Sequence, residues 1–210
     1  MELSKALALF FKVPEEGKVK TRLAKTLGKA FAIKVYKHLL KKTICTLENL
    51  KGVALFGFYS GKIILEGFSY FNFKKNWKII PQEGNDLSEK LKVAVELLFA
   101  LGYEKIVLIG ADCPYLTPFY ISLAFQKLEE YPVVIGPAKD GGYVLLGLTQ
   151  NFPNYHILFD GLPFETSELL KETLIRLPEK SFYLLPTLED VDTFGDLLRY
   201  LLKGYLKKKI

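Results

Sequence analysis

The 210-residue sequence has only two cysteines, two histidines and one methionine. Cys45 and Cys113 form no CxxC motif and no cluster with histidine, which argues against a disulfide framework and a structural zinc site. His38 and His156 lie in contexts that do not suggest catalysis. Ser-His-Asp and Cys-His chemistry are therefore disfavoured.

The sequence also lacks a membrane span, because no apolar window approaches the required length. The apolar stretch near the N-terminus is too short for a secretory signal and has no small-residue cleavage site, so we expect a cytoplasmic protein. The net charge of +6 comes from scattered lysines and a C-terminal lysine run rather than from a basic stripe with stacking aromatics. We therefore expect a solvated surface and no nucleic-acid partner. Nothing in the sequence indicates the oligomeric state.

Buried-looking apolar runs alternate with segments of helical periodicity along the chain. Strands are expected at residues 6–11, 53–59, 77–81, 105–110, 132–136, 142–148 and 182–185. Helices are expected at residues 29–47, 87–101 and 166–176, after residue 117, and from about residue 193. The stretch 62–76 is aromatic and irregular. This pattern predicts one α/β domain over residues 1–210, with a mostly parallel sheet and helices on both faces.

A basic loop between the first strand and the first helix is the most informative segment. It covers residues 12–28 and contains Lys12, Lys18, Lys20 and Arg22. Backbone N–H groups, a helix N-terminus and cationic side chains together hold phosphate groups in many α/β proteins. The loop matches neither a Walker A motif nor a GxGxxG fingerprint. The alternative is a solvated turn whose lysines are incidental.

Acidic residues follow the ends of other predicted strands. Asp112 lies between a strand-ending Gly110 and Pro114, where its carboxylate suits a divalent cation or, alternatively, caps its own turn. Asp140 precedes Gly141 and Gly142, which permit close backbone approach to a ligand and are equally typical of a hairpin turn.

Two further acids, Asp190 and Asp192, precede the last helix and project to the same side of an extended segment. An N-cap role for Asp192 or Thr193 explains one acid and not both. Because ligands of open α/β sheets bind beyond the carboxyl ends of strands, we expect the basic loop and these acids at one edge. Lysine and Mg²⁺ there would neutralise a polyphosphate.

Five strings carry a family resemblance over nearly the whole chain. The chain resembles a bacterial family of unknown function in the GT-A glycosyltransferase-like, nucleotide-diphospho-sugar transferase superfamily. Some members of that family are labelled arsenosugar biosynthesis glycosyltransferases. Similar strings occur in 2-phospholactate guanylyltransferases and, more loosely, in molybdenum-cofactor guanylyltransferases. The strings are residues 11–14 (Phe-Lys-Val-Pro), 17–23 (Gly-Lys-Val-Lys-Thr-Arg-Leu), 110–114 (Gly-Ala-Asp-Cys-Pro), 136–143 (Gly-Pro-Ala-Lys-Asp-Gly-Gly-Tyr) and 190–193 (Asp-Val-Asp-Thr).

The resemblance implies a Rossmann-like GT-A fold that binds a nucleotide with Mg²⁺ or Mn²⁺. The nucleotide-binding positions would be Lys12, Gly17, Lys18, Lys20, Thr21 and Arg22. The metal would be held by Asp112 together with Asp190 or Asp192. The acceptor side would be lined by Asp140, Gly141, Gly142, Tyr143 and Phe164.

The expected activity is metal-dependent nucleotidyl transfer from a nucleoside triphosphate to a small phosphorylated acceptor. Lys20 and Arg22 would bind the leaving pyrophosphate, and the metal on Asp112 and Asp192 would balance the developing charge. The alternative is glycosyl transfer from a nucleotide sugar, with Asp140 as the base toward the acceptor hydroxyl. A second alternative is a nucleotide-binding protein without turnover. The base, the sugar and the acceptor are not defined by the sequence.

Overall fold

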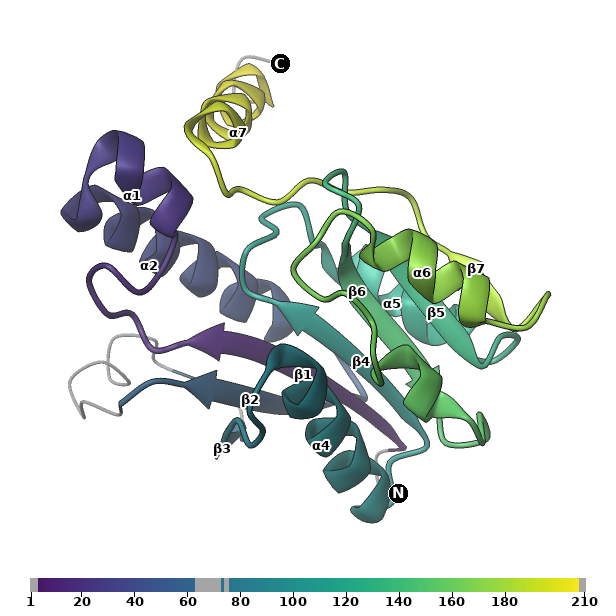
Figure 1. Cartoon of the computed structure of the whole chain (residues 1–210). Coiled ribbons are helices and arrows are strands. Elements are labelled where there is room, and N and C mark those ends of the chain that lie inside the picture. The colour runs from purple at the N-terminus through teal and green to yellow at the C-terminus, as the bar shows by residue number, and fades with distance from the viewer. Residues whose placement is uncertain (1–3, 63–72, 74–75, 208–210) are drawn as a thin grey trace.

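A computed structural model describes residues 4–62, 73 and 76–207 of the chain. The predicted irregular stretch 62–76 falls almost entirely outside these described residues. The described strands form one seven-stranded sheet in the order β3-β2-β1-β4-β6-β5-β7 (Figure 1). Their bounds are β1 (Lys5–Lys12), β2 (Ala54–Ser60), β3 (Lys78–Pro81), β4 (Lys105–Gly110), β5 (Val133–Pro137), β6 (Tyr143–Thr149) and β7 (Phe182–Leu184).

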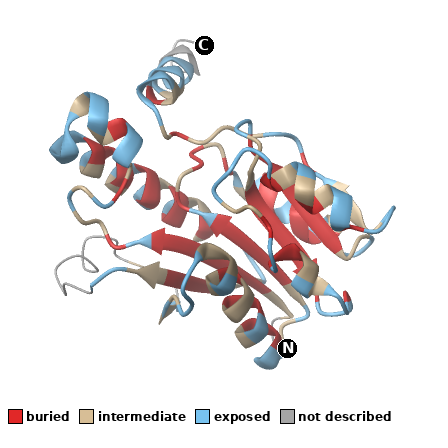
Figure 2. Ribbon diagram, viewed as in Figure 1, coloured by how far each residue is buried: buried red, intermediate tan, exposed pale blue. Residues whose placement is uncertain are grey.

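Helices cover both faces of the sheet, as the alternating pattern predicted. Their bounds are α1 (Thr21–Leu27), α2 (Lys29–Leu47), α4 (Leu87–Ala100), α5 (Pro118–Lys127), α6 (Leu169–Arg176) and α7 (Phe194–Lys207), with a 3₁₀ turn η1 (Tyr155–Leu158). The apolar sides of α2 and α5 pack on one face, and α4 packs on the other. Successive residues of β1 alternate between the two cores, because side chains of a strand point to opposite faces. Figure 2 shows the buried residues running along the central strands.

Strand β6 is the exception to the parallel sheet. It pairs antiparallel with both β4 and β5, whereas the other strand pairs are parallel. The Asp140-Gly141 turn joins β5 directly to β6, so a hairpin replaces a crossover helix at this point. The carboxyl ends of the other six strands therefore meet at one edge of the sheet.

Two predicted boundaries were wrong. Residues 12–28 are not loop throughout, because Thr21–Leu27 forms helix α1. The helix predicted at 166–176 begins only at Leu169, since Thr166 is held in a turn by a hydrogen bond from its hydroxyl to the carbonyl of Pro163 (2.8 Å). Thr21 and Arg22 consequently lie in the first turn of α1 rather than in a flexible loop.

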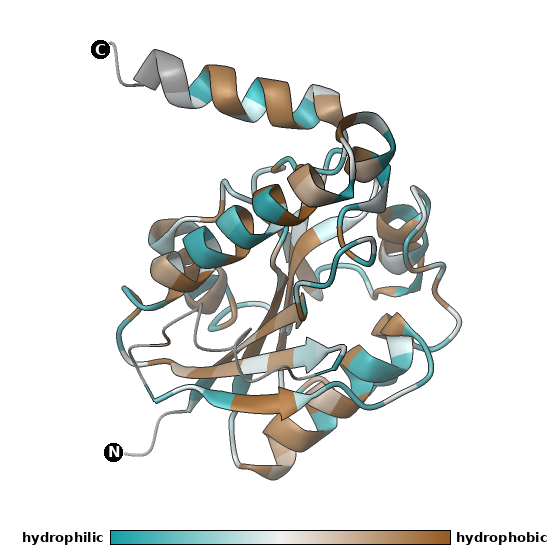
Figure 3. Ribbon diagram, turned by 90° about the vertical axis from the view of Figure 1, so that its left-hand side faces the viewer, coloured by the Kyte–Doolittle hydropathy of each residue, from teal (hydrophilic) through white to brown (hydrophobic). Residues whose placement is uncertain are grey.

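The last helix, α7, lies near α1 and α2 rather than on the sheet (Figures 1 and 3). A small apolar cluster joins Leu197 of α7 to Leu23 of α1, Leu39 of α2 and Val191. Helix α7 also leaves several large apolar residues exposed, namely Phe194, Leu198, Leu201 and Leu202. In the described part of the chain, no helix is long and apolar enough to cross a membrane.

Candidate functional site

Lys20 lies at the junction between the loop after β1 and the start of α1. Its neighbours Val19 and Leu23 are buried, which anchors the backbone on both sides of it. The backbone of Lys20 adopts the left-handed conformation, with φ 49° and ψ 48°. The side chain is only 3% exposed, and its Nζ lies 2.9 Å from Asp112 Oδ1 and 2.6 Å from Asp192 Oδ1. Lys20 and Asp192, which are 172 positions apart in the sequence, are thus in direct contact.

The two carboxylates keep the Lys20 side chain charged in its buried position. Burial alone disfavours the ammonium, but the charges of Asp112 and Asp192 outweigh this and raise the pKa of Lys20 above its ordinary value. The carboxylates themselves remain accessible, with side chains 46% and 38% exposed. The cluster can therefore meet a ligand from solvent.

Asp112 is positioned by the turn that follows β4. Ala111 and Cys113 on either side of it are buried, and the backbone carbonyl of Asp112 accepts a hydrogen bond from Val191 N (3.3 Å). The Cys113 thiol donates to the carbonyl of Glu189 (3.4 Å), and burial is the main cause that raises its pKa to about 12. Cys113 is therefore a packing residue and not a nucleophile.

Residues 185–192 form an extended strap that carries three acids past the ends of β4 and β5. Leu188 N donates to the carbonyl of Pro137 (2.9 Å), and Lys139 N donates to the carbonyl of Leu188 (3.0 Å). This pairing continues the direction of β5 beyond the strand, as a parallel bridge between Ala138 and Leu188. The strap brings Asp190 and Asp192 to the edge where Asp112 lies.

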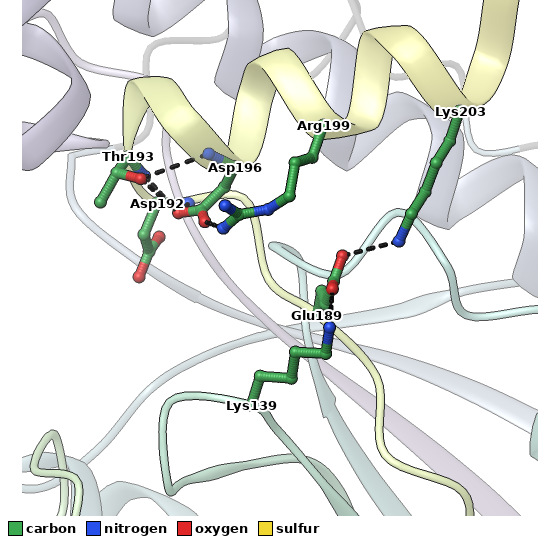
Figure 4. Close-up of polar contacts among 7 residues, drawn as sticks. All are labelled: Lys139, Glu189, Asp192, Thr193, Asp196, Arg199 and Lys203. Atoms are coloured by element: carbon green, nitrogen blue, oxygen red, sulfur yellow. Dashed lines mark hydrogen bonds and ion pairs between the residues drawn. The ribbon is translucent and has the colours of Figure 1, made fainter.

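Glu189 fixes the strap through two lysines from different elements (Figure 4). Its carboxylate is paired with Lys139 from the β5–β6 turn and with Lys203 of α7, the latter at 2.8 Å. Hydrogen bonds from these lysines lower the pKa of Glu189 to about 2. Because its charge is fully used in these pairs, Glu189 holds the strap in place and is not free for a ligand.

Asp190 differs from Glu189 and Asp192 in forming no ion pair with any residue that the structure describes. It is partly buried. Burial first, and then the charges of Asp112, Asp192 and Asp140, raise the pKa of Asp190 to about 7. Asp190 therefore lies close enough to the other three acids to be affected by their charges, which Lys20 partly offsets.

The start of α7 shows which residue caps it. Thr193 and Asp196 form a capping box, in which Asp196 N donates to Thr193 Oγ1 (3.3 Å) and Thr193 N donates to Asp196 Oδ2 (2.7 Å) (Figure 4). Arg199 is also paired with Asp196. The side chain of Asp192 is not needed for the cap and is left for Lys20.

The β5–β6 turn places the predicted acceptor-side residues. Asp140 is exposed and its Oδ1 accepts from Gly142 N (3.1 Å). Gly141 has φ 92°, and a Cβ there would lie 2.0 Å from the carbonyl oxygen of Ser167. The ring of Tyr143 packs edge-on against Phe164, with centroids 6.3 Å apart. The turn is thus pressed against the segment before α6.

The remaining residues of the basic loop do not join the Lys20 cluster. The backbone of Lys12 is held by the Tyr36 hydroxyl, which accepts from Lys12 N (2.8 Å) and donates to Lys12 O (3.0 Å). Lys18 is 72% exposed and pairs with Glu15 at 3.1 Å. Gly17 adopts φ 79° in the turn between them. Arg22 is exposed in the first turn of α1.

Three residues that organise the site do not stand out in the sequence. Glu189 directly precedes the string 190–193, but its partners Lys139 and Lys203 lie 50 and 14 positions away. Tyr36 fits the apolar side of the α2 pattern, which gives no sign of a hydroxyl that anchors β1. Cys113 is a neighbour of Asp112, and only its burial and its bond to Glu189 reveal its role.

The residues of the cluster fit a divalent metal that arrives with other ligands. Over the residues that the structure describes, no three His, Cys, Asp or Glu side chains converge closely enough to hold a metal. Asp112 and Asp192 do share one cationic partner, the Lys20 ammonium. Mg²⁺ is commonly held by one or two carboxylates, with water and substrate phosphates completing the shell. Two carboxylates therefore suffice for a metal bound together with phosphate.

Comparison with known sequences decides the family. The family described as "uncharacterized protein conserved in bacteria" (DUF2064) matches residues 46–166. The chain belongs to this family. The resemblance predicted from the motifs is thereby confirmed. No curated protein matches this DUF2064 chain.

Solved structures confirm the fold. A protein from Desulfovibrio desulfuricans G20, provisionally described as a nucleotide-diphospho-sugar transferase, is 32% identical with a TM-score of 0.83, covering 91% of this chain and 84% of the other. CMP:2-keto-3-deoxy-manno-octonic acid synthetase, solved with CTP, is 11% identical with a TM-score of 0.60 and covers 98% and 100% of the two chains. Glucosyl-3-phosphoglycerate synthase from Mycobacterium tuberculosis, solved with Mn²⁺, UDP and phosphoglyceric acid, is 12% identical with a TM-score of 0.53 and covers 93% and 74%. The DUF2064 chain thus has the Rossmann-like fold of nucleotide-diphospho-sugar transferases.

Proposed function

We propose that this DUF2064 protein is a metal-dependent transferase that moves a nucleotidyl group from a nucleoside triphosphate to a small phosphorylated acceptor. The observation that carries the proposal is the meeting of Lys20 with Asp112 and Asp192 at the carboxyl edge of β1 and β4. This edge is where ligands of open α/β sheets bind. Cationic and metal-binding groups at one point are what a polyphosphate substrate requires.

In the proposed reaction, an oxygen of the acceptor phosphate attacks the α-phosphorus of the triphosphate. A new P–O bond forms there, while the bond to the β-phosphate oxygen breaks and pyrophosphate leaves. Lys20 and Arg22 bind the leaving pyrophosphate and offset its charge. Asp112 and Asp192 would hold Mg²⁺ or Mn²⁺, which supplies further charge neutralisation when bound. The fold relative solved with CTP supports a triphosphate as the donor.

Glycosyl transfer is the second candidate. It is favoured by the exposed carboxylate of Asp140, a residue of the β5–β6 turn that lies near Asp190. A base on that side could take the proton of an acceptor hydroxyl. The fold relative solved with UDP and phosphoglyceric acid supports this alternative. A third candidate is nucleotide binding without turnover.

Product analysis separates these candidates. The purified chain is incubated with Mg²⁺ or Mn²⁺, small phosphorylated acceptors, and either each nucleoside triphosphate or each sugar nucleotide. Acceptor-dependent pyrophosphate release is the expected result, and nucleoside diphosphate from a sugar nucleotide would favour glycosyl transfer instead. Lys20→Ala should remove either product, whereas Lys25→Ala, which removes an exposed lysine of the adjoining helix α1, should not. Ligand-induced stabilisation without any product would favour the binding protein.

A further inference from the structure

A divalent metal bound between Asp112 and Asp192 would compete with Lys20 for these two carboxylates. The ammonium lies within ion-pair distance of Oδ1 on both Asp112 and Asp192. Asp112 Oδ1 is buried and has no hydrogen-bond partner, so this ion pair is its only compensation among the described residues. A metal cannot bind to these oxygens until the ammonium leaves, because the two cations would occupy one position.

The side chain of Lys20, rather than its backbone, is the part that can move. Val19 and Leu23 are buried, and the carbonyl of Lys20 accepts the first hydrogen bond of α1 from Ala24 N (2.8 Å). These contacts hold the backbone at the start of the helix. The four-carbon side chain has several rotamers, so the ammonium can change partners without displacing α1.

A polyphosphate offers what the free metal lacks. Two carboxylates provide only part of the coordination shell of Mg²⁺ or Mn²⁺, and phosphate oxygens complete it. The same phosphate oxygens are strong acceptors for a lysine ammonium. A metal–polyphosphate complex therefore brings both the remaining metal ligands and a new partner for Lys20, while the metal alone brings neither.

We propose that the Lys20 ammonium occupies the cation position between Asp112 and Asp192 and thereby excludes a free divalent metal. A metal binds there only together with a polyphosphate, whose oxygens become the new partners of the ammonium. This inference rests on the proposed function and narrows its substrate to a metal-bound polyphosphate. Lys20 then has two roles: it excludes the free metal from the site, and it binds phosphate when the metal–polyphosphate complex is present.

Binding of Mn²⁺ alone tests the inference, because it needs no substrate and no turnover. The concentration of free Mn²⁺ is followed by electron paramagnetic resonance during titration of the full chain. Lys20→Met removes the charge with an unbranched side chain and should bind Mn²⁺ roughly tenfold more tightly, or better, than the unmodified chain. Lys25→Met is the matched control and should bind as the unmodified chain does.

Two further variants and a thermal measurement extend this test. Lys20→Gln, which is neutral but keeps a donor toward Asp192, serves the same test if Lys20→Met does not fold. Lys20→Arg keeps a cation and should not gain affinity for Mn²⁺. The melting temperature of the unmodified chain should rise with Mn²⁺ plus tripolyphosphate and not with Mn²⁺ alone.

Two results would overturn the inference. One is a folded Lys20→Met or Lys20→Gln variant that binds Mn²⁺ no more tightly than the unmodified chain. The other is an unmodified chain that Mn²⁺ alone stabilises as much as Mn²⁺ with tripolyphosphate. If the neutral variants gain affinity but no triphosphate or sugar nucleotide stabilises the chain, the competition at Lys20 stands and the proposed function fails.

Discussion

At the scale of single residues, Asp112 combines a backbone held in place with a carboxylate that solvent can reach. We predict that Asp112→Asn lowers the proposed transferase activity by about a hundredfold or more, since it removes the charge of a proposed metal ligand without changing side-chain size. The chain should remain folded, because Lys20 still pairs with Asp192. Pyrophosphate release and circular dichroism provide the two measurements.

Asp160→Asn is the matched control for this change. Its carboxylate is 61% exposed and pairs with Lys92 on the surface. Exposed pairs contribute little to stability, so this variant should keep both fold and activity. Equal activity of Asp112→Asn and Asp160→Asn would remove Asp112 from the mechanism.

Asp190 should give the metal-free chain an unusual dependence on pH. Burial and neighbouring carboxylates raise its pKa to about 7, above the value of 3.8 that it has when exposed. Between these two values the folded chain binds more protons than the unfolded chain, so the free energy of unfolding must fall as the pH rises. We predict a loss of about 1–3 kcal/mol from this group between pH 4 and pH 7, measured by urea unfolding.

The variant Asp190→Asn isolates this effect. It should flatten the loss of stability between pH 4 and pH 7 and be more stable than the unmodified chain at pH 8. Glu189 acts in the opposite direction, because its pKa of about 2 lies below the value of 4.5 that it has when exposed, so its stabilisation is fully present only above that value. The unmodified chain and Asp190→Asn share this contribution, so the difference between them reports Asp190 alone. A pH slope that is unchanged by Asp190→Asn would show that the carboxylate is not destabilised in the fold.

At the scale of elements, the β5–β6 turn contains two adjacent glycines with different tasks. Gly141 has φ 92°, and a side chain there meets the backbone of Ser167, whereas a Cβ at Gly142 would lie 3.4 Å from Asp140 Oδ1. We predict that Gly141→Ala lowers the free energy of unfolding by about 2 kcal/mol or more, while Gly142→Ala costs about 1 kcal/mol or less. Denaturant unfolding of both variants makes the comparison, and equal losses would contradict it.

The elements themselves are largely predictable, and the exceptions have local causes. Apolar runs of the right length identify the strands, but the sequence before α1 carries no Ser, Thr, Asp or Asn at the N-cap. Lys20 occupies that position without a side-chain cap bond, so the short helix has no recognisable start signal. The antiparallel direction of β6 follows from the Asp-Gly turn, whose sequence fits both a hairpin and a ligand loop.

The sheet topology predicts which segments of the candidate site lie together, but not how their side chains pair. The rule that strand ends share an edge is enough to predict that Lys20, Asp112 and Asp192 lie together. It cannot show that Lys20 turns inward to the acids while Lys18 pairs with Glu15. Nor can it show that the charge of Glu189 is balanced by Lys139 and Lys203, whereas Asp190 forms no ion pair among the described residues. Such differences depend on side-chain directions, which pattern and spacing do not encode.

At the scale of the whole molecule, the two main apolar cores share their strands and cannot separate. Adjacent residues of β1 and of β4 enter opposite cores, for example Leu7 and Ala8 in β1. Removing one layer of helices would therefore expose the other face of the same strands. We predict that denaturant unfolds the chain in one cooperative transition, which would support a single domain.

The only tryptophan gives a test of this cooperativity. Trp77 directly precedes the edge strand β3 and packs with Phe73, with ring centroids 5.0 Å apart, whereas β7 lies at the opposite edge of the sheet. Tryptophan fluorescence therefore reports one edge, and far-ultraviolet circular dichroism reports helices and strands throughout. Coincident denaturant midpoints are expected, because unfolding at one edge exposes the central strands that both cores require. A fluorescence transition well below the dichroism transition would mean that the β3 edge unfolds as a separate unit.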